Sequence, residues 1–272
     1  MINSFFNQIK ILTGAFVVLV TLISPSSLIA SNDGYTSTTL ITGANRGIGF
    51  EFAKQYLSKG WKVIATCRKP ESADQLILLQ EKFPTLLIID RLDVTDHSQI
   101  DQLAEKYAGT PIDVLLNNAG ISGDTKNQIF GRMNYDVYEK VLAVNTIGPL
   151  KMAEAFYPHV KASKQKKIIT VSSSEGSIAT ADKRGGGRLF FYRSSKSALN
   201  MVMVNLALQL KNRGVAVGMI NPGATDTDFM TGLPFPLRKT EVAVSDMIRN
   251  IDSITVENTG AYLNYNGKTV PW

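Results

Sequence analysis

Short apolar segments alternate along the chain with longer segments in which apolar residues recur every three or four positions. The short segments predict strands and the longer segments predict helices. Strands are expected at residues 38–42, 62–66, 85–90, 112–117, 167–172, 215–220 and 261–265. Helices are expected at residues 48–58, 71–82, 97–108, 133–160, 193–212 and 240–251. The alternation indicates one folded domain over residues 37–272.

The expected strands are apolar almost throughout, rather than at every second position. Such strands are typical of a sheet that is covered on both faces, and strands that alternate with helices form parallel βαβ units. We therefore predict an α/β fold: a single doubly wound Rossmann domain that has a parallel sheet of about seven strands and helices on both faces.

Residues 1–30 follow a different pattern. One positive charge, Lys10, precedes an apolar run over residues 11–23, and residues 24–30 resemble a cleavage region. This arrangement predicts a secretory signal peptide, and an uncleaved N-terminal membrane anchor is the alternative. Because no basic residue follows the apolar run until Arg46, either reading would place the domain outside the membrane.

The formal net charge is +6, but lysine and arginine occur at most in short pairs. This pattern favours a scattered basic surface and a phosphate-binding cofactor site, and no nucleic-acid partner is expected. Cys67 is the only cysteine, which excludes an intrachain disulfide. No metal-ligand spacing occurs, so we expect no metal.

A glycine-rich turn follows the first expected strand and precedes the first expected helix. Backbone amides at the start of such a helix can face a pyrophosphate. The glycines are spaced G-x3-G-x-G, which differs from the general dinucleotide fingerprint. The expected cofactor-binding residues of this turn are Gly43, Asn45, Arg46, Gly47, Ile48 and Gly49.

The end of the second strand bears on the choice of dinucleotide. An acidic residue at that place accepts hydrogen bonds from ribose hydroxyls and repels a 2′-phosphate. Here the strand runs into Cys67, Arg68 and Lys69, and Arg46 can approach the same side. Two cations near one phosphate favour NADP over NAD, and a solvated loop is the alternative role for Arg68 and Lys69.

A phenol and an amine are spaced for proton transfer at Tyr192 and Lys196. Residues at i and i+4 share one helix face. An ammonium about 5 Å from a phenolate stabilises it by roughly 3 kcal/mol at an effective dielectric constant near 20, which is about two pKa units. We therefore expect Lys196 to lower the pKa of Tyr192. Tyr157 and Lys161 have the same spacing, but only Tyr192 follows a hydroxyl-rich strand end.

Together these motifs resemble the short-chain dehydrogenase/reductase family. Its T-G-x-x-x-G-x-G motif matches Thr42–Gly49, its N-N-A-G motif matches Asn117–Gly120, and its P-G-x-x-x-T motif matches Pro222–Thr227. Within the family, the segment from Tyr192 to Asn200 and the ending from Asn266 to Trp272 resemble the C-factor/sniffer-type carbonyl reductases. The resemblance covers residues 38–272.

The resemblance implies roles for individual residues. The implied catalytic residues are Asn145, Ser173, Tyr192 and Lys196, with Ser172 and Ser174 as alternatives to Ser173. In this reading Asn145 holds a water next to the lysine, and Asp93 lies on the adenine side. The further implied cofactor-binding residues are Val94, Asn118, Ala119, Gly120, Tyr192, Lys196, Pro222, Gly223, Thr225 and Thr227.

One segment departs from the family pattern. Nineteen positions separate Ser173 from Tyr192, which is longer than usual, and the additional residues form a basic loop at 183–188. This loop either closes over an anionic substrate or is solvated and has no role.

The expected function is an NADP(H)-dependent oxidoreductase that interconverts a carbonyl and an alcohol of a small molecule. A non-catalytic NADP-binding sensor is the alternative. The apolar segment from Met201 to Leu208 predicts core and subunit-interface positions, hence a homo-oligomer. The N-terminal pattern suggests export or membrane attachment, whereas NADP dependence suggests the cytoplasm.

Overall fold

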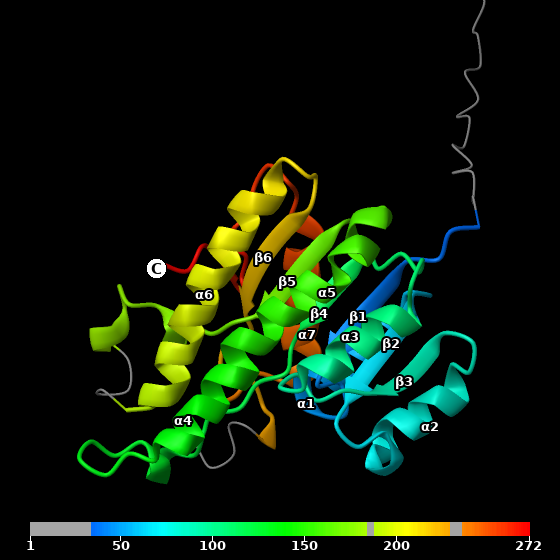
Figure 1. Ribbon diagram of the computed structural model, residues 1–272. Coiled ribbons are helices and arrows are strands. Elements are labelled where there is room, and N and C mark those ends of the chain that lie inside the picture. The colour runs from blue at the N-terminus through cyan, green and yellow to red at the C-terminus, as the bar shows by residue number, and fades with distance from the viewer. Residues whose placement is uncertain (1–33, 184–187, 229–235) are drawn as a thin grey trace, which may run out of the picture. The chain divides into compact units, whose positions relative to one another are not determined.

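The computed structural model describes residues 34–183, 188–228 and 236–272. Residues 36–272 form one compact unit built on a seven-stranded sheet in the order β3-β2-β1-β4-β5-β6-β7 (Figure 1). All the strand pairs are parallel. The strands are β1 (Thr38–Thr42), β2 (Lys62–Cys67), β3 (Leu87–Arg91), β4 (Val114–Asn117), β5 (Lys167–Val171), β6 (Ala216–Asn221) and β7 (Ala261–Asn264).

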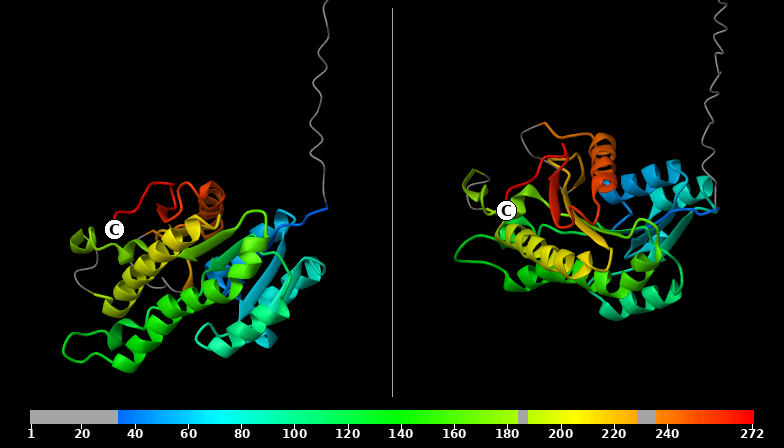
Figure 2. Two further views of the ribbon diagram at one scale, coloured as in Figure 1. Left: turned by 45° about the horizontal axis from the view of Figure 1, so that its top comes forward. Right: turned by 90° about the horizontal axis from the view of Figure 1, so that it is seen from above.

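Helices cover both faces of the sheet (Figure 2). Apolar side chains of α3 (His97–Lys106), α5 (Gly148–Ala162) and α6 (Phe190–Lys211) pack in one buried cluster. Those of α1 (Gly47–Ser58), α2 (Asp74–Lys82) and α7 (Thr240–Ser253) pack in a second cluster. The strands between these clusters are buried on both sides, which explains their continuous apolar sequences.

The predicted doubly wound Rossmann fold is confirmed, and most element boundaries lie within two or three residues of the expected ones. The order in which the strands are added to the sheet changes direction between β1 and β4. β2 and β3 lie on the β1 side of this point, and β5, β6 and β7 lie on the β4 side. Ligands of such sheets bind outside the carboxyl ends of the strands at this place.

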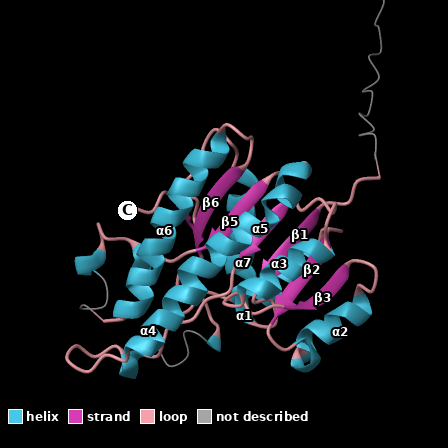
Figure 3. Ribbon diagram, in the orientation of Figure 1, coloured by secondary structure: helices cyan, strands magenta, loops and turns pink. Residues whose placement is uncertain are grey.

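The prediction of a single helix at 133–160 is wrong in one respect. The segment consists of α4 (Tyr135–Leu142), a π-helical turn at Ala143–Ile147 and α5. Figure 3 shows α4 and α5 in the colour of helices. Pro149 has no backbone N–H and therefore cannot donate the helical hydrogen bond at this place. The π turn contains Asn145, which is fully buried.

The expected signal peptide or membrane anchor at residues 1–30 lies outside the described residues. Within the described ranges, no helix has the length and apolar character required to cross a membrane.

Candidate active site

The glycine-rich turn after β1 is tied to the end of β4 by side-chain hydrogen bonds. The Asn118 side-chain amide donates to the carbonyls of Thr42 and Gly43 at 2.9 and 3.1 Å. In return the Thr42 hydroxyl accepts from the backbone amides of Asn118 and Ala119 at 3.0 and 3.1 Å. These four bonds fix the distance between two segments that are seventy-five residues apart.

Two glycines of this turn are required by close packing. Gly43 has a φ of +66°, and a Cβ atom there would lie 3.0 Å from the Ala119 Cα. A Cβ atom on Gly49 would lie 2.3 Å from the Gly43 carbonyl oxygen and 2.5 Å from the Asn118 amide nitrogen. Larger residues at either position would therefore push the turn away from β4.

The first turn of α1 offers backbone amides without a competing side-chain cap. Arg46 precedes the helix in an extended conformation, and its side chain makes no capping hydrogen bond. No acidic residue occupies the first turn of the helix. Free N–H groups and the helix dipole at this end favour a bound anion.

Arginine side chains and carboxylates pair with one another at this end of the sheet. The exposed Arg46 guanidinium lies 3.2 Å from a carboxylate oxygen of Asp228. Arg91, at the end of β3, donates to the Arg68 carbonyl at 3.2 Å and pairs with Glu71 at 2.9 Å. Arg91 thus fixes the backbone at Arg68 through a hydrogen bond and neutralises the negative charge of Glu71 through an ion pair.

On the predicted adenine side, Asp93 accepts hydrogen bonds from the Thr95 amide and hydroxyl at 3.0 and 2.7 Å. Its own amide donates to the Gln99 side chain. The neighbouring Val94 is buried. Both residues therefore lie in a turn at the carboxyl end of β3 that side-chain hydrogen bonds stabilise.

The Pro222–Thr227 segment follows β6 and is held by Arg238. The Arg238 guanidinium donates to the Pro222 carbonyl at 3.1 Å, forms an ion pair with Asp246 and stacks 3.7 Å from the Tyr265 ring centroid. Thr227 approaches the glycine-rich turn, because a Cβ atom on Gly47 would lie 3.3 Å from its Cγ2.

Three serines follow β5, and their environments differ. Ser172 is buried, and its hydroxyl donates to Asn200 at 2.6 Å. The Ser173 hydroxyl accepts from the Glu175 amide and hydrogen-bonds to the Tyr192 side chain. Of the candidates, Ser173 is therefore the hydroxyl that the structure brings to the phenol.

Tyr192 and Lys196 lie in the first two turns of α6, which begins three residues earlier than expected. The Lys196 amine is buried, lies 5.7 Å from the Tyr192 ring centroid and donates to the Val171 carbonyl at 2.9 Å. Gly120 lies beside the same amine, because a Cβ atom on Gly120 would be 3.7 Å from the Lys196 amine nitrogen. The amine therefore ties the end of β5 to α6 and lies close to the segment that follows β4.

The Tyr157–Lys161 pair of equal spacing lies elsewhere. Its ring is 5.9 Å from the Lys161 amine and 5.8 Å from the guanidinium of Arg213, which follows the last turn of α6. Tyr192 is at the opposite end of that helix, about 30 Å away at 1.5 Å per residue.

The electrostatics differ from the expectation that Lys196 lowers the pKa of Tyr192. Burial raises the pKa of Tyr192 to about 12, the hydrogen bond from Ser173 opposes this shift, and the charge of Glu175 adds to it. Burial also lowers the pKa of Lys196 to about 8. The estimate from spacing was wrong because it omitted the loss of water around both groups.

Asn145 occupies the π turn beside this pair. Its carbonyl oxygen accepts from the Ile121 amide at 2.9 Å, and its amide nitrogen donates to the Ile121 carbonyl and to Ser195 at 2.8 and 3.0 Å. A Cβ atom on Gly120 would lie 3.4 Å from its oxygen and 3.7 Å from the Lys196 amine. The structure thus places Asn145 near the lysine.

Sequence reasoning assigned no role to Arg91, Ser195 or Arg238. Each acts through contacts between segments distant in the sequence, and no local motif marks them. Of the basic loop at 183–188, residues 184–187 lie outside the described ranges, so the proposed closure over an anionic substrate stays a prediction. The described ranges contain no cluster of three or more His, Cys, Asp or Glu residues that is suited to hold a metal ion.

Comparison with known proteins gives consistent matches. The family model described as short chain dehydrogenase matches residues 37–234. A 1-hydroxy-2-glutathionyl-2-methyl-3-butene dehydrogenase from Rhodococcus sp. (strain AD45) is 30% identical over 240 residues, which are 87% of this chain and all of the relative.

Solved structures show the same relationship. The NADPH-bound carbonyl reductase from chicken fatty liver has a TM-score of 0.80 and 31% identity, covering 87% of this chain and 99% of that one. The carbonyl reductase Sniffer of D. melanogaster has a TM-score of 0.77 and 27% identity, covering 88% of this chain and all of that one. With the parallel sheet, the glycine-rich turn and the Tyr192–Lys196 pair in place, the chain belongs to the short-chain dehydrogenase/reductase family of oxidoreductases.

Proposed function

We propose that this chain interconverts a carbonyl and an alcohol by hydride transfer with NADP(H), and that Tyr192 is the general acid/base. The observation that carries the proposal is that three groups come together at the carboxyl end of β5: the Ser173 hydroxyl, the Tyr192 phenol and the buried Lys196 amine. This amine lies 5.7 Å from the Tyr192 ring centroid and donates to the Val171 carbonyl. Similarity to carbonyl reductases, one of them NADPH-bound, supports the same reaction.

The donor set around the turn after β1 fits a phosphorylated dinucleotide. The uncapped first turn of α1 offers amides to a pyrophosphate, and Arg46 and Arg68 offer guanidinium groups to a 2′-phosphate. When bound, the nicotinamide supplies or accepts the hydride.

The protein's own residues would manage the proton. The Ser173 hydroxyl would hold the substrate oxygen, and the Tyr192 phenol would donate its proton to that oxygen as the carbonyl is reduced. A pKa of about 12 keeps the phenol protonated at neutral pH, as this direction requires. Lys196 would bring a positive charge next to the phenolate left behind, and Asn145 would orient a proton donor beside the lysine.

The experiment that tests the proposal is NADPH oxidation by the purified protein with a panel of aldehydes and ketones. We expect turnover with at least one of them, slower turnover with NADH, and none without a carbonyl. Tight NADPH binding without turnover on the whole panel would instead favour the non-catalytic sensor.

Cofactor preference gives a separate prediction at the two arginines. Arg46→Ala and Arg68→Ala should each weaken NADPH binding about 10-fold or more, since a charge-assisted hydrogen bond contributes about 1.5–3 kcal/mol. Binding of NADH, which lacks the 2′-phosphate, should change less than about 3-fold.

Fluorescence titration with both dinucleotides measures these constants. Lys59→Ala is the matched control, because Lys59 is an exposed cation at the other end of α1, paired with Asp252. Equal losses for NADH and NADPH in the two arginine variants would contradict the assignment.

A further inference from the structure

The helix that carries Tyr192 has no cap of its own. α6 begins at Phe190, and the preceding Leu189 has a left-handed backbone with a φ of 62° and a side chain that makes no capping hydrogen bond. The first amides of a helix have no partner within the helix. Phe191 is fully buried, so its amide requires an acceptor from another segment.

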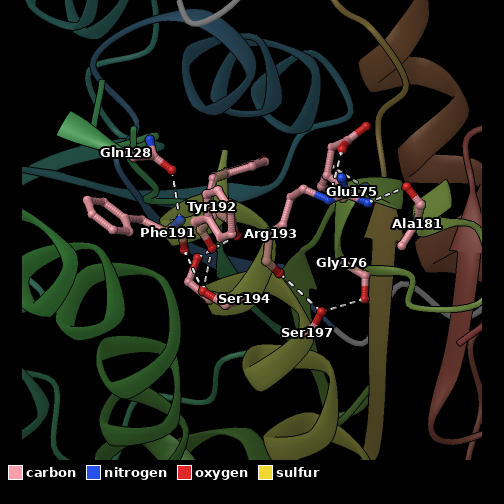
Figure 4. Close-up of polar contacts among 12 residues, drawn as sticks. Gln128, Glu175, Gly176, Ala181, Phe191, Tyr192, Arg193, Ser194 and Ser197 are labelled. Atoms are coloured by element: carbon pink, nitrogen blue, oxygen red, sulfur yellow. Dashed lines mark hydrogen bonds and ion pairs between the residues drawn. The ribbon is translucent and has the colours of Figure 1, made fainter. Parts of the chain in front are cut away.

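Gln128 supplies that acceptor from the segment between β4 and α4. Its side-chain oxygen accepts from the Phe191 amide at 2.7 Å, one residue before Tyr192 (Figure 4). Its side-chain nitrogen donates to the carbonyls of Ser122 and Asp124 at 2.8 and 3.0 Å. The residue is only 4% exposed, so these bonds are shielded from water.

The same segment is joined to the π turn. Ile121 exchanges two hydrogen bonds with the Asn145 amide, and Asn145 donates to the Ser195 hydroxyl. The Ser195 hydroxyl in turn donates to the Tyr192 carbonyl at 2.8 Å. The backbone around Tyr192 is therefore held on one side through Gln128 and on the other through Ser195.

From this geometry we infer that Gln128 is a positioning residue, which fixes the first turn of α6 so that the Tyr192 phenol stays beside Ser173. The inference rests on the proposed function for its catalytic consequence, but the capping contact can be measured without turnover. The buried Gln128 side chain hydrogen-bonds both to the first turn of α6 and to its own segment. Loss of these bonds would therefore loosen the turn and misplace the phenol.

Two variants separate capping from general stability of the segment. Gln128→Met removes the acceptor for the Phe191 amide, together with the two donated hydrogen bonds, at similar side-chain volume. Asn127→Ala is the control, because the Asn127 side chain donates to the Gly123 carbonyl within the same segment.

We expect Gln128→Met to lower kcat about 10-fold while the Kd for NADPH changes less than about 2-fold. Amide exchange at Phe191 should accelerate about 10-fold in Gln128→Met only. Unchanged exchange in that variant, or an equal loss of kcat in Asn127→Ala, would overturn the inference.

Two further readouts keep the test decisive. If Gln128→Met does not fold, exchange in the wild-type protein decides: the Phe191 amide should exchange at least about 100-fold more slowly than an unprotected amide. Unprotected exchange there would refute the capping role. If the wild type turns over no carbonyl, the proposed function fails, whereas the exchange data still decide the role of Gln128.

Discussion

Replacing Tyr192 with phenylalanine is expected to lower kcat/KM for carbonyl reduction about 10³-fold, within the range that general acids contribute. The substitution removes only the phenolic oxygen, which hydrogen-bonds to Ser173. The ring and its packing remain, so the fold should persist. Steady-state rates of NADPH oxidation measure the loss, and titration should show a Kd for NADPH within about 3-fold of wild type.

The chain offers a matched control for this substitution. Tyr157 has a lysine at the same spacing, lies on a partly exposed surface and contacts Arg213. Tyr157→Phe should therefore retain full activity. A Tyr192→Phe protein that folds and reduces carbonyls at the wild-type rate would show that another group supplies the proton.

Lys196→Met should produce the second large effect, a loss of activity together with a gain of stability. Without the amine, the phenolate that forms during reduction lacks a neighbouring positive charge, and kcat should fall about 10²-fold or more. Burial holds the folded-state pKa of Lys196 at about 8, below its ordinary value of 10.5. The charged amine therefore destabilises the fold at neutral pH.

The sign of the pH dependence follows from proton binding. Between pH 8 and 10.5 the unfolded chain binds more protons at this lysine than the folded chain, so the stability of the wild type rises with pH over that window. At pH 7 the full cost is present, and Lys196→Met should raise the free energy of unfolding by about 2 kcal/mol after the lost bond to Val171 is included.

Urea denaturation at pH 7 and pH 9.5 measures this difference. The advantage of Lys196→Met should shrink at the higher pH, because the wild-type amine has by then lost its charge. Lys82→Met, at an exposed lysine in α2, should change stability by less than about 0.5 kcal/mol. A Lys196→Met protein less stable than wild type at pH 7 would contradict the buried-charge assignment.

The parallel sheet and the alternation of strands and helices along the chain could be predicted, because both depend on local sequence patterns. Continuous apolar strands such as β5 and β6 are buried along their whole length, and the helices between them have their own apolar spacing. The glycine-rich turn and the Tyr192–Lys196 pair were likewise found by spacing within a few residues.

The remaining features depend on contacts between distant segments. Burial of Tyr192 reversed the expected direction of its pKa shift, and no spacing rule includes burial. The π turn around Asn145 forms where its amide meets Ile121, twenty-four residues earlier. Gln128 caps a helix sixty-three residues later, so its role is visible only in three dimensions.

The central claim is that hydride passes between a nicotinamide and a carbonyl carbon at this site. The most direct measurement is the fate of deuterium from NADPH in which both hydrogens at C4 of the nicotinamide are replaced by deuterium, incubated with the wild-type protein and a carbonyl that it turns over. We expect one deuterium on the carbinol carbon of each alcohol formed. An unlabelled alcohol, or labelled NADPH that binds but is never consumed across the carbonyl panel, would contradict the account.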